Sequence, residues 1–383
     1  MARHARRADA GFEAGNGDPT VTWDGFTVPT RYWHVVDDGR IQCDVCPRAC
    51  KLHEGQRGLC FLRARLQDQV VLTSYGRSSG FCVDPIEKKP LNHFLPGSSV
   101  LSFGTAGCNL ACRFCQNWDI SKSKDVDSLA DVASPADIVK AAQHLRCRSV
   151  AFTYNDPVIF HEYAIDVADA CHEVGMYTVA VSAGYVCPEP RGEFYSRIDA
   201  ANIDLKAFSE EFYRHICGGR LEAIKDTLRY VHQETPVWLE VTTLLIPGLN
   251  DSDKEVDSLA SWVASDLGID VPVHFSAFHP DYKLANLPST PPGTLSRARR
   301  IALAVGLSHV YIGNVSDTDG SSTYCAGCGQ VLVERDWYTI RRYRLTDHGQ
   351  CTRCGKQLAG VFDGPVGTWG ARRLPVRLTP LVS

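Results

Sequence analysis

Three closely spaced cysteines form the stretch of the chain with the clearest chemical potential. Cys108, Cys112 and Cys115 follow one another in a C-x3-C-x2-C pattern. The apolar residues 99–103 before them predict a buried strand, so the thiols should lie on the loop that leaves this strand. Three thiolates can hold a 4Fe-4S cluster by three of its irons, and the fourth iron then keeps an open position for a substrate. The pattern therefore indicates an enzyme.

A second set of cysteines lies nearer the N-terminus. Cys43, Cys46, Cys50 and Cys60 have the spacing C-x2-C-x3-C-x9-C. Four thiols at this spacing predict a small metal-binding module. Zinc and an auxiliary iron-sulfur cluster both accept four thiolates, so the sequence leaves the metal open.

A third set of cysteines lies near the C-terminus. Cys325 and Cys328 form one C-x2-C pair, Cys351 and Cys354 form another, and a glycine follows each pair. Two C-x2-C motifs at this separation predict a zinc ribbon. A zinc ion with four thiolates has no free position for chemistry, so we expect this module to stabilise the end of the chain or to dock a partner.

The composition of the 383 residues is that of an ordinary soluble globular protein, with 44% hydrophobic and 22% charged residues. The net charge of -4 argues against a nucleic-acid-binding surface. No apolar run is long enough to span a membrane. Residues 1–20 carry arginines with no apolar segment after them, so we expect a disordered head rather than a secretory signal. In the cytoplasm, where we expect the protein, its 16 cysteines should be reduced and able to bind metals.

Strand-like and helix-like stretches alternate through the middle of the chain. Repeated βα units predict an α/β fold with a parallel sheet, closed or partly closed like a TIM barrel. Strands are expected at 99–103, 149–153, 177–182, 201–205, 236–245 and 271–276, with helices that open at Ser134 and span 158–174, 221–232, 254–267 and 295–305.

Polar residues at the carboxyl ends of these strands are candidates for a site, because ligands bind at that end of such sheets. Asn155 and Asp156 follow the second strand, although Asn-Asp-Pro is also an ordinary helix-opening turn. Asp204 and Lys206 share one face after the fourth strand, where they fit either an active site or a buried structural ion pair. Further candidates are Ser182, Gly184, Glu240, His274, Ser276 and His279.

The segment before the first strand offers three more candidates. Lys88, Lys89 and His93 lead directly into the strand that carries the cysteine loop. A solvated turn is the alternative, because Pro85 and Pro90 break any helix there.

The chain resembles radical S-adenosylmethionine (SAM) enzymes in the spacing of its central cysteines and in the aromatic Phe114. It resembles most the radical SAM member of the AmmeMemoRadiSam system, which is similar in turn to the pyruvate formate-lyase-activating enzymes. The resemblance covers the chain from about Cys43 to Val361. The stretches that carry it are Glu87 to Leu91, Cys115 to Trp118, Tyr154 to Pro157, Asp204 to Lys206, Ile246 to Asp251 and Tyr311 to Asn314.

This resemblance implies a partial (βα)6 barrel and a role for several residues. Phe114 should pack near the SAM adenine. Asn155 and Asp156 should take the place of the family's Gly-Gly-Glu type turn at the SAM amino group. The remaining implied positions are Ser182 and Gly184 near the ribose, Asp204 and Lys206 as catalytic residues near the SAM carboxylate, and Glu240 as a further cofactor-binding residue.

The implied reaction is the reductive cleavage of SAM to methionine and a 5'-deoxyadenosyl radical that removes a hydrogen atom from a substrate. A low-potential donor such as flavodoxin or ferredoxin should supply the electron. The resemblance also implies a Memo-like protein and an AMMECR-type protein as partners. The substrate is either a residue of a partner protein or a small molecule. The alternative function is a non-catalytic metal-binding scaffold whose thiols hold zinc throughout.

The sequence predicts four regions in chain order. A disordered head spans residues 1–20, and a cysteine-rich module spans 21–95. The radical SAM core spans 96–316, and a zinc-ribbon-like module with the tail spans 317–383.

Overall fold

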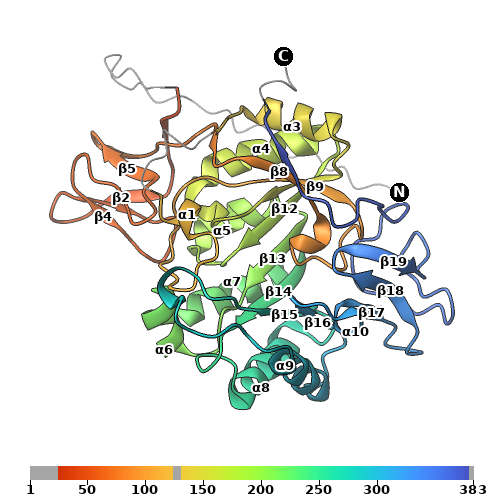
Figure 1. Cartoon of the computed structure of the whole chain (residues 1–383). Helices are drawn as coiled ribbons and strands as arrows, with labels where there is room; N and C mark the ends of the chain where they lie inside the picture. Colours follow the sequence, from red (N-terminus) through yellow and green to blue (C-terminus); the bar gives the residue numbers. More distant parts are fainter. Residues whose placement is uncertain (1–24, 124–130, 379–383) are drawn as a thin grey trace.

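The computed structural model describes residues 25–123 and 131–378. The predicted head, residues 1–20, lies outside the described residues. A large central sheet carries helices, and two smaller β-rich parts flank it on opposite sides in Figure 1: the cysteine-rich module in orange and the ribbon in blue.

Seven parallel strands build the centre of the sheet, in the order β16-β15-β14-β13-β12-β11-β9. Every residue of β9 and β11 is buried, as expected for strands covered on both faces. The strands are β9 (Ser99–Phe103), β11 (Ser149–Phe152), β12 (Tyr177–Ser182), β13 (Ala200–Asp204), β14 (Trp238–Leu245), β15 (Val273–Ala277) and β16 (Val310–Gly313).

The predicted α/β fold with a parallel sheet is confirmed, but its predicted strand number was too low. The six predicted strands are present, and Val310–Gly313, which was not among the predicted strands, forms a seventh strand beside β15. Two antiparallel strands extend the opposite edge, where β8 (Phe81–Pro85) pairs with β9 and β20 (Leu374–Val376) pairs with β8. Both come from regions that the sequence assigned to the flanking modules.

Helices connect successive parallel strands. The predicted start of α3 is confirmed: the Ser134 hydroxyl accepts a hydrogen bond from Asp137 N, the Asp137 carboxylate accepts one from Ser134 N, and Pro135 occupies the first turn. The helices are α1 (Trp118–Ser121), α3 (Pro135–His144), α4 (His161–Glu173), α5 (Pro188–Tyr195), α6 (Glu210–Phe212), α7 (Leu221–Glu234), α8 (Asp253–Trp262), α9 (Pro292–Val305) and α10 (Thr318–Ser321).

The cysteine-rich module consists of short antiparallel strands. Two three-stranded sheets have the orders β1-β6-β5 and β2-β3-β4, and β7 of the module pairs with β10, which belongs to the core region. These strands are β1 (Val28–Pro29), β2 (Trp33–Val35), β3 (Ile41–Cys43), β4 (Lys51–Leu52), β5 (Arg63–Leu66), β6 (Gln69–Leu72), β7 (Arg77–Ser78) and β10 (Asp131–Val132).

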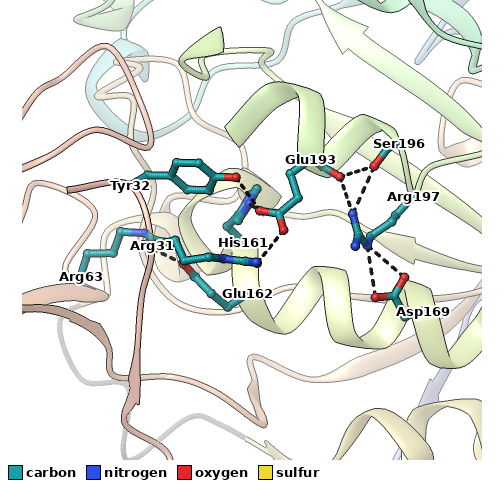
Figure 2. A network of polar contacts seen from close by, with 9 residues as sticks. All are labelled: Arg31, Tyr32, Arg63, His161, Glu162, Asp169, Glu193, Ser196 and Arg197. Carbon is teal, nitrogen blue, oxygen red and sulfur yellow. Dashed lines mark hydrogen bonds and ion pairs between the residues drawn. The ribbon is translucent and has the colours of Figure 1, made fainter. Parts of the chain in front are cut away.

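A polar network attaches this module to α4 and α5 (Figure 2). Arg63 of β5 forms a buried, bidentate ion pair with Glu162 of α4. Glu193 of α5 accepts a hydrogen bond from the Tyr32 hydroxyl at 2.7 Å and forms an ion pair of 2.7 Å with the Arg31 guanidinium. The buried charges are therefore paired across the junction, which fixes the module on the core.

The ribbon is a three-stranded antiparallel sheet that docks on the segment after β8. Its strands are β17 (Thr323–Tyr324), β18 (Val331–Asp336) and β19 (Thr339–Tyr343). The side chain of Arg335 is 1% exposed and donates to the carbonyl of Asn92 at 2.7 Å and to the hydroxyl of Thr323 at 2.8 Å. Its Nε lies 3.7 Å from a carboxylate oxygen of buried Glu87, so a buried ion pair lies at the ribbon–core junction.

No helix within the described ranges 25–123 and 131–378 is both long and apolar enough to cross a membrane.

We expect Arg335→Met to lower the free energy of unfolding by about 3 to 5 kcal/mol, because it leaves the Glu87 carboxylate buried without its cation. Urea unfolding of the purified protein measures the change. The control Arg341→Met removes an exposed ion pair with Asp336 and should cost less than about 1 kcal/mol. Equal losses in the two variants would contradict a stabilising role for the buried arginine.

Candidate active site

A cavity of about 900 Å³ lies at the carboxyl ends of the parallel strands. Cys108, Cys112 and Cys115 all contribute to its lining. Most of the strand-end candidates from the sequence also line it, namely Phe114, Asn155, Asp156, Ser182, Asp204, Lys206, His274 and Ser276, together with Lys88 and Lys89. The arrangement is the one expected for a site at the carboxyl edge of a parallel sheet.

The end of β11 holds the loop that carries the three cysteines. The Asn155 side chain donates to the carbonyl of Gly107 at 2.8 Å and accepts from Thr105 N at 3.2 Å. Further along the loop, Asn109 donates from its amide to the carbonyl of Tyr185 at 2.8 Å. Both polar atoms of the Asn155 amide therefore hold the loop in position.

A segment after β13 holds the other side of the same loop. Ala111 N donates to the carbonyl of Cys217 at 2.7 Å, and Arg113 N donates to the carbonyl of Ile216 at 2.9 Å. Gly218 follows with a φ of 67°, and a Cβ there would lie 3.3 Å from that of Ala111. Our sequence reasoning missed this support. The cysteine followed by two glycines was the available signal, because glycine permits both the left-handed conformation and the close approach.

The three central thiols suit a cluster better than a single ion. All three thiols line one cavity, but their sulfur atoms do not all lie within 4.8 Å of one another. Such spacing is expected when each thiolate binds a different iron. Burial raises the pKa of Cys108 to about 12, whereas a hydrogen bond with Cys217 lowers the pKa of Cys112 to about 7.

Asp156 joins two strand ends beneath the cavity. Its carboxylate accepts hydrogen bonds from Val158 N, the Ser182 hydroxyl and Ala183 N, at 3.1, 3.0 and 3.0 Å. Burial raises its pKa above the ordinary value. A carboxylate offers about four acceptor positions, so these three hydrogen bonds leave one position unused.

Asp204 and Lys206 form an ion pair of 2.7 Å at the end of β13. The side chain of Lys206 is 14% exposed, and its Nζ lies 6.0 Å from the centre of the Phe114 ring. Burial opposes the charge of Lys206, but the negative charges of Asp204 and Cys112 outweigh it and raise the pKa of Lys206 well above its ordinary value. The site therefore offers a fixed ammonium group to an anionic ligand.

Glu240, predicted to bind the cofactor, does not contribute to the cavity lining. Its carboxylate is fully buried and accepts from Asn92 N, His93 N, Trp238 Nε1 and His274 Nε2. Four donors occupy its acceptor positions, so its role is to fix the sheet and the segment before β9.

Gly184 and His93 also lie outside the lining. A Cβ on Gly184 would meet the Ile203 side chain at 3.0 Å, so this glycine, with a φ of 65°, serves the tight turn after β12. The two His93 ring nitrogens contact the Ala359 carbonyl and the Tyr311 hydroxyl at 2.8 and 2.6 Å, which leaves neither for a ligand.

Residues from both flanking regions complete the wall of the active-site cavity. Lys88 and Lys89 pair with buried Asp84 at 2.9 and 2.7 Å, and the Tyr154 hydroxyl donates to the same carboxylate at 3.0 Å. The ribbon and the tail contribute Arg335, Trp337, Tyr338 and Arg373. Sequence reasoning missed these contributions of the ribbon and the tail, because no local pattern shows which distant segment covers a sheet end.

Fold and site together define an α/β protein with a cysteine-lined cavity at the carboxyl edge of its sheet. The model of the Radical SAM superfamily matches residues 103–260. An uncharacterized protein from Methanocaldococcus jannaschii is 36% identical over 328 residues, which cover 85% of this chain and 97% of that protein. The chain belongs to the radical SAM superfamily, whose members use a 4Fe-4S cluster and SAM.

Two further relatives are activating enzymes. A 4-hydroxyphenylacetate decarboxylase activating enzyme from Clostridioides difficile is 20% identical over 289 residues, 71% of this chain and 89% of that enzyme. A pyruvate formate-lyase-activating enzyme from Clostridium pasteurianum is 23% identical over 195 residues, 47% of this chain and 80% of that enzyme. The chain is therefore similar to the activating enzymes.

We expect Asp204→Asn to weaken SAM binding at least about tenfold, or about 1.4 kcal/mol, because Lys206 loses the carboxylate that fixes its ammonium group. Isothermal titration of the anaerobically reconstituted protein measures the affinity. The stability should change by less than about 1 kcal/mol, since the Asp204 side chain is 32% exposed.

The matched control is Glu222→Gln, which removes a carboxylate 3.0 Å from Lys225 on α7, outside the cavity. It should bind SAM like the unaltered protein. Unchanged SAM affinity in folded Asp204→Asn would remove the ion pair from the site.

Proposed function

We propose that this chain reductively cleaves SAM at a 4Fe-4S cluster bound by Cys108, Cys112 and Cys115. The observation that carries the proposal is that these thiols and the Asp204–Lys206 ion pair line one cavity. Membership of the radical SAM superfamily supports it. When bound, the cluster and SAM supply a one-electron reduction that yields methionine and the hydrogen-abstracting 5'-deoxyadenosyl radical.

The residues of the chain bind and orient SAM in this proposal. Lys206 offers its ammonium group to the SAM carboxylate, and Asp156 keeps an acceptor position for the amino group. Phe114 packs near the adenine, and Ser182 lies near the ribose. Asn155, which the sequence assigned to the amino group, positions the cysteine loop instead, because both ends of its amide are engaged.

The substrate in this proposal is a residue of a partner protein, as the names of the activating-enzyme relatives suggest. The cavity volume is near the upper end of small-molecule sites, which leaves room for a substrate group beside SAM. A small-molecule substrate is the alternative. We also propose membership of the AmmeMemoRadiSam system, with Memo-like and AMMECR-type partners, a flavodoxin or ferredoxin donor, a cytoplasmic location and a core that is a partly closed barrel.

The test is the formation of 5'-deoxyadenosine by anaerobically reconstituted protein with dithionite as reductant. Cys112→Ala should abolish this product, because one iron loses its ligand. The control Cys147→Ala alters a buried cysteine outside the three sets and should retain the activity. Full activity in Cys112→Ala would overturn the proposal. Zinc in place of iron in the unaltered protein would favour the scaffold alternative.

The C-terminal cysteines support a second, structural proposal, which is that the ribbon binds zinc. Four sulfurs bound at about 2.3 Å to one tetrahedral ion lie about 3.8 Å apart. The Sγ atoms of Cys325 and Cys354 are 3.5 Å apart, those of Cys328 and Cys351 are 3.8 Å apart, and all four lie within 4.8 Å of one another. This spacing supports one ion with four thiolates.

We expect Cys328→Ser to lose the ribbon zinc and to raise amide hydrogen exchange over residues 325–354, since metal binding and local folding are coupled at such sites. Metal analysis and hydrogen exchange mass spectrometry measure the two effects. The iron content should stay the same. Loss of iron together with zinc would show that the ribbon is not a separate metal-binding unit.

A further inference from the structure

The four N-terminal cysteines surround a second cavity, separate from the proposed active site. Cys43, Cys46, Cys50 and Cys60 all line it. They come from β3, from the loop that joins β3 to β4, and from the turn before β5. Cys43 and Cys60 are buried, and Cys46 and Cys50 are partly exposed.

The spacing of these four sulfurs differs from that of the ribbon. In the part of the chain that the structure describes, the ribbon cysteines are the only group of three or more possible metal ligands whose donor atoms all lie within 4.8 Å of one another. The N-terminal cysteines line one cavity but do not meet this condition. Thiolates around one zinc ion lie about 3.8 Å apart, whereas thiolates at the corners of a 4Fe-4S cube bind different irons and stand further apart.

Two arginines of the same lining carry unused hydrogen-bond donors. Nη2 of Arg48 and Nε of Arg63 are buried and have no hydrogen-bond partner. The Arg63 side chain is 2% exposed, and its two other nitrogens pair with Glu162 (Figure 2). Buried donors without partners are costly, so these groups indicate an anionic ligand in the cavity. A cluster with four thiolates is such an anion, and its sulfur atoms accept hydrogen bonds.

This second cavity lies directly against the cysteine loop of the active site. Asn109, the neighbour of Cys108, contributes to its lining, and Arg48 donates from Nε to the Asn109 carbonyl at 3.0 Å. Gly107 has a φ of 87°, and a Cβ there would lie 2.0 Å from the carbonyl oxygen of Cys60. Only glycine allows this approach, so the backbones of the two cysteine motifs are in contact.

We propose that Cys43, Cys46, Cys50 and Cys60 bind a second 4Fe-4S cluster, which passes single electrons from an external protein donor to the active-site cluster. Four protein ligands leave no iron open, so this cluster binds no SAM. In the transfer the reduced donor loses one electron, the second cluster gains and then loses it, and the active-site cluster gains it; no bond forms or breaks. The partly exposed Cys46 and Cys50 lie where a donor can approach. The relay role rests on the proposed function, whereas the cluster itself does not.

Metal analysis of the triple variant Cys108→Ala, Cys112→Ala, Cys115→Ala tests the cluster, because this variant leaves the N-terminal module unaltered. We expect it to retain about four iron and four sulfide per chain after anaerobic reconstitution. Its reduced form should give an electron paramagnetic resonance signal that SAM does not change. Zinc in place of iron, or no metal beyond that of the ribbon, would overturn the proposal.

A donor comparison in Cys46→Ala tests the relay. With dithionite, which reduces the active-site cluster directly, 5'-deoxyadenosine formation should stay within about twofold of the unaltered protein. With reduced flavodoxin it should fall at least tenfold, and the Cys147→Ala control should show neither loss. Equal activity with both donors would overturn the relay but not the cluster.

If Cys46→Ala fails to fold, the iron content of the triple variant still decides whether the second cluster exists. Reduction of that iron by flavodoxin, followed by electron paramagnetic resonance, then decides whether the module accepts electrons. Absence of 5'-deoxyadenosine from the unaltered protein, with iron retained in the triple variant, would instead reject the proposed function.

Discussion

The position of the loop after β9 is the constraint on which the rest of the site depends. Residues 104–117 contain no helix or strand, so their shape comes from hydrogen bonds to other elements. Asn155 holds the start of the loop and the backbone of Ile216 and Cys217 holds its middle. Parallel strands end at one edge of the sheet, which brings these distant groups together. Three thiols are thereby fixed without occupying regular structure of their own.

Buried ion pairs attach the flanking modules to this core in the same manner. Arg63 with Glu162 holds the cysteine-rich module, and Arg335 with Glu87 holds the ribbon. A buried pair contributes little net stability compared with an apolar contact, but one partner without the other is strongly unfavourable. Such pairs therefore favour one docked arrangement over others, which matters here because both modules approach the site.

The sequence predicted the elements whose signals are local. The capping residues Ser134 and Asp137 marked the start of α3, and continuous apolar runs marked the central strands. Helix α5 was missed because Pro190 and Gly192 lower its helix propensity. Strand β16 was missed as a member of the sheet because its run is short and leads into Gly313 and Asn314.

The sequence could predict the site residues that lie at the ends of the parallel strands. Asp204, Lys206, Asp156 and Ser182 line the cavity, as expected for residues at the carboxyl ends of parallel strands. Glu240 lies outside the cavity lining, and the sequence could not show this, because its partners Asn92 and His93 lie almost 150 residues earlier in the chain and no local pattern shows that they occupy its carboxylate. Contacts of this range arise only from the fold.

The sulfur spacing of the two outer cysteine sets suits the place of each module. The ribbon contributes Trp337 and Tyr338 to the wall of the cavity, where a radical would form under the proposed function. Zinc has no redox chemistry, so a compact zinc site there would shape the wall without offering electrons to a radical. The wider N-terminal set lies behind the cysteine loop, on the side away from the ribbon, where a redox-active cluster could deliver an electron without entering the cavity. Under the two proposals, the path of the electron would therefore be separate from the wall that encloses the substrate.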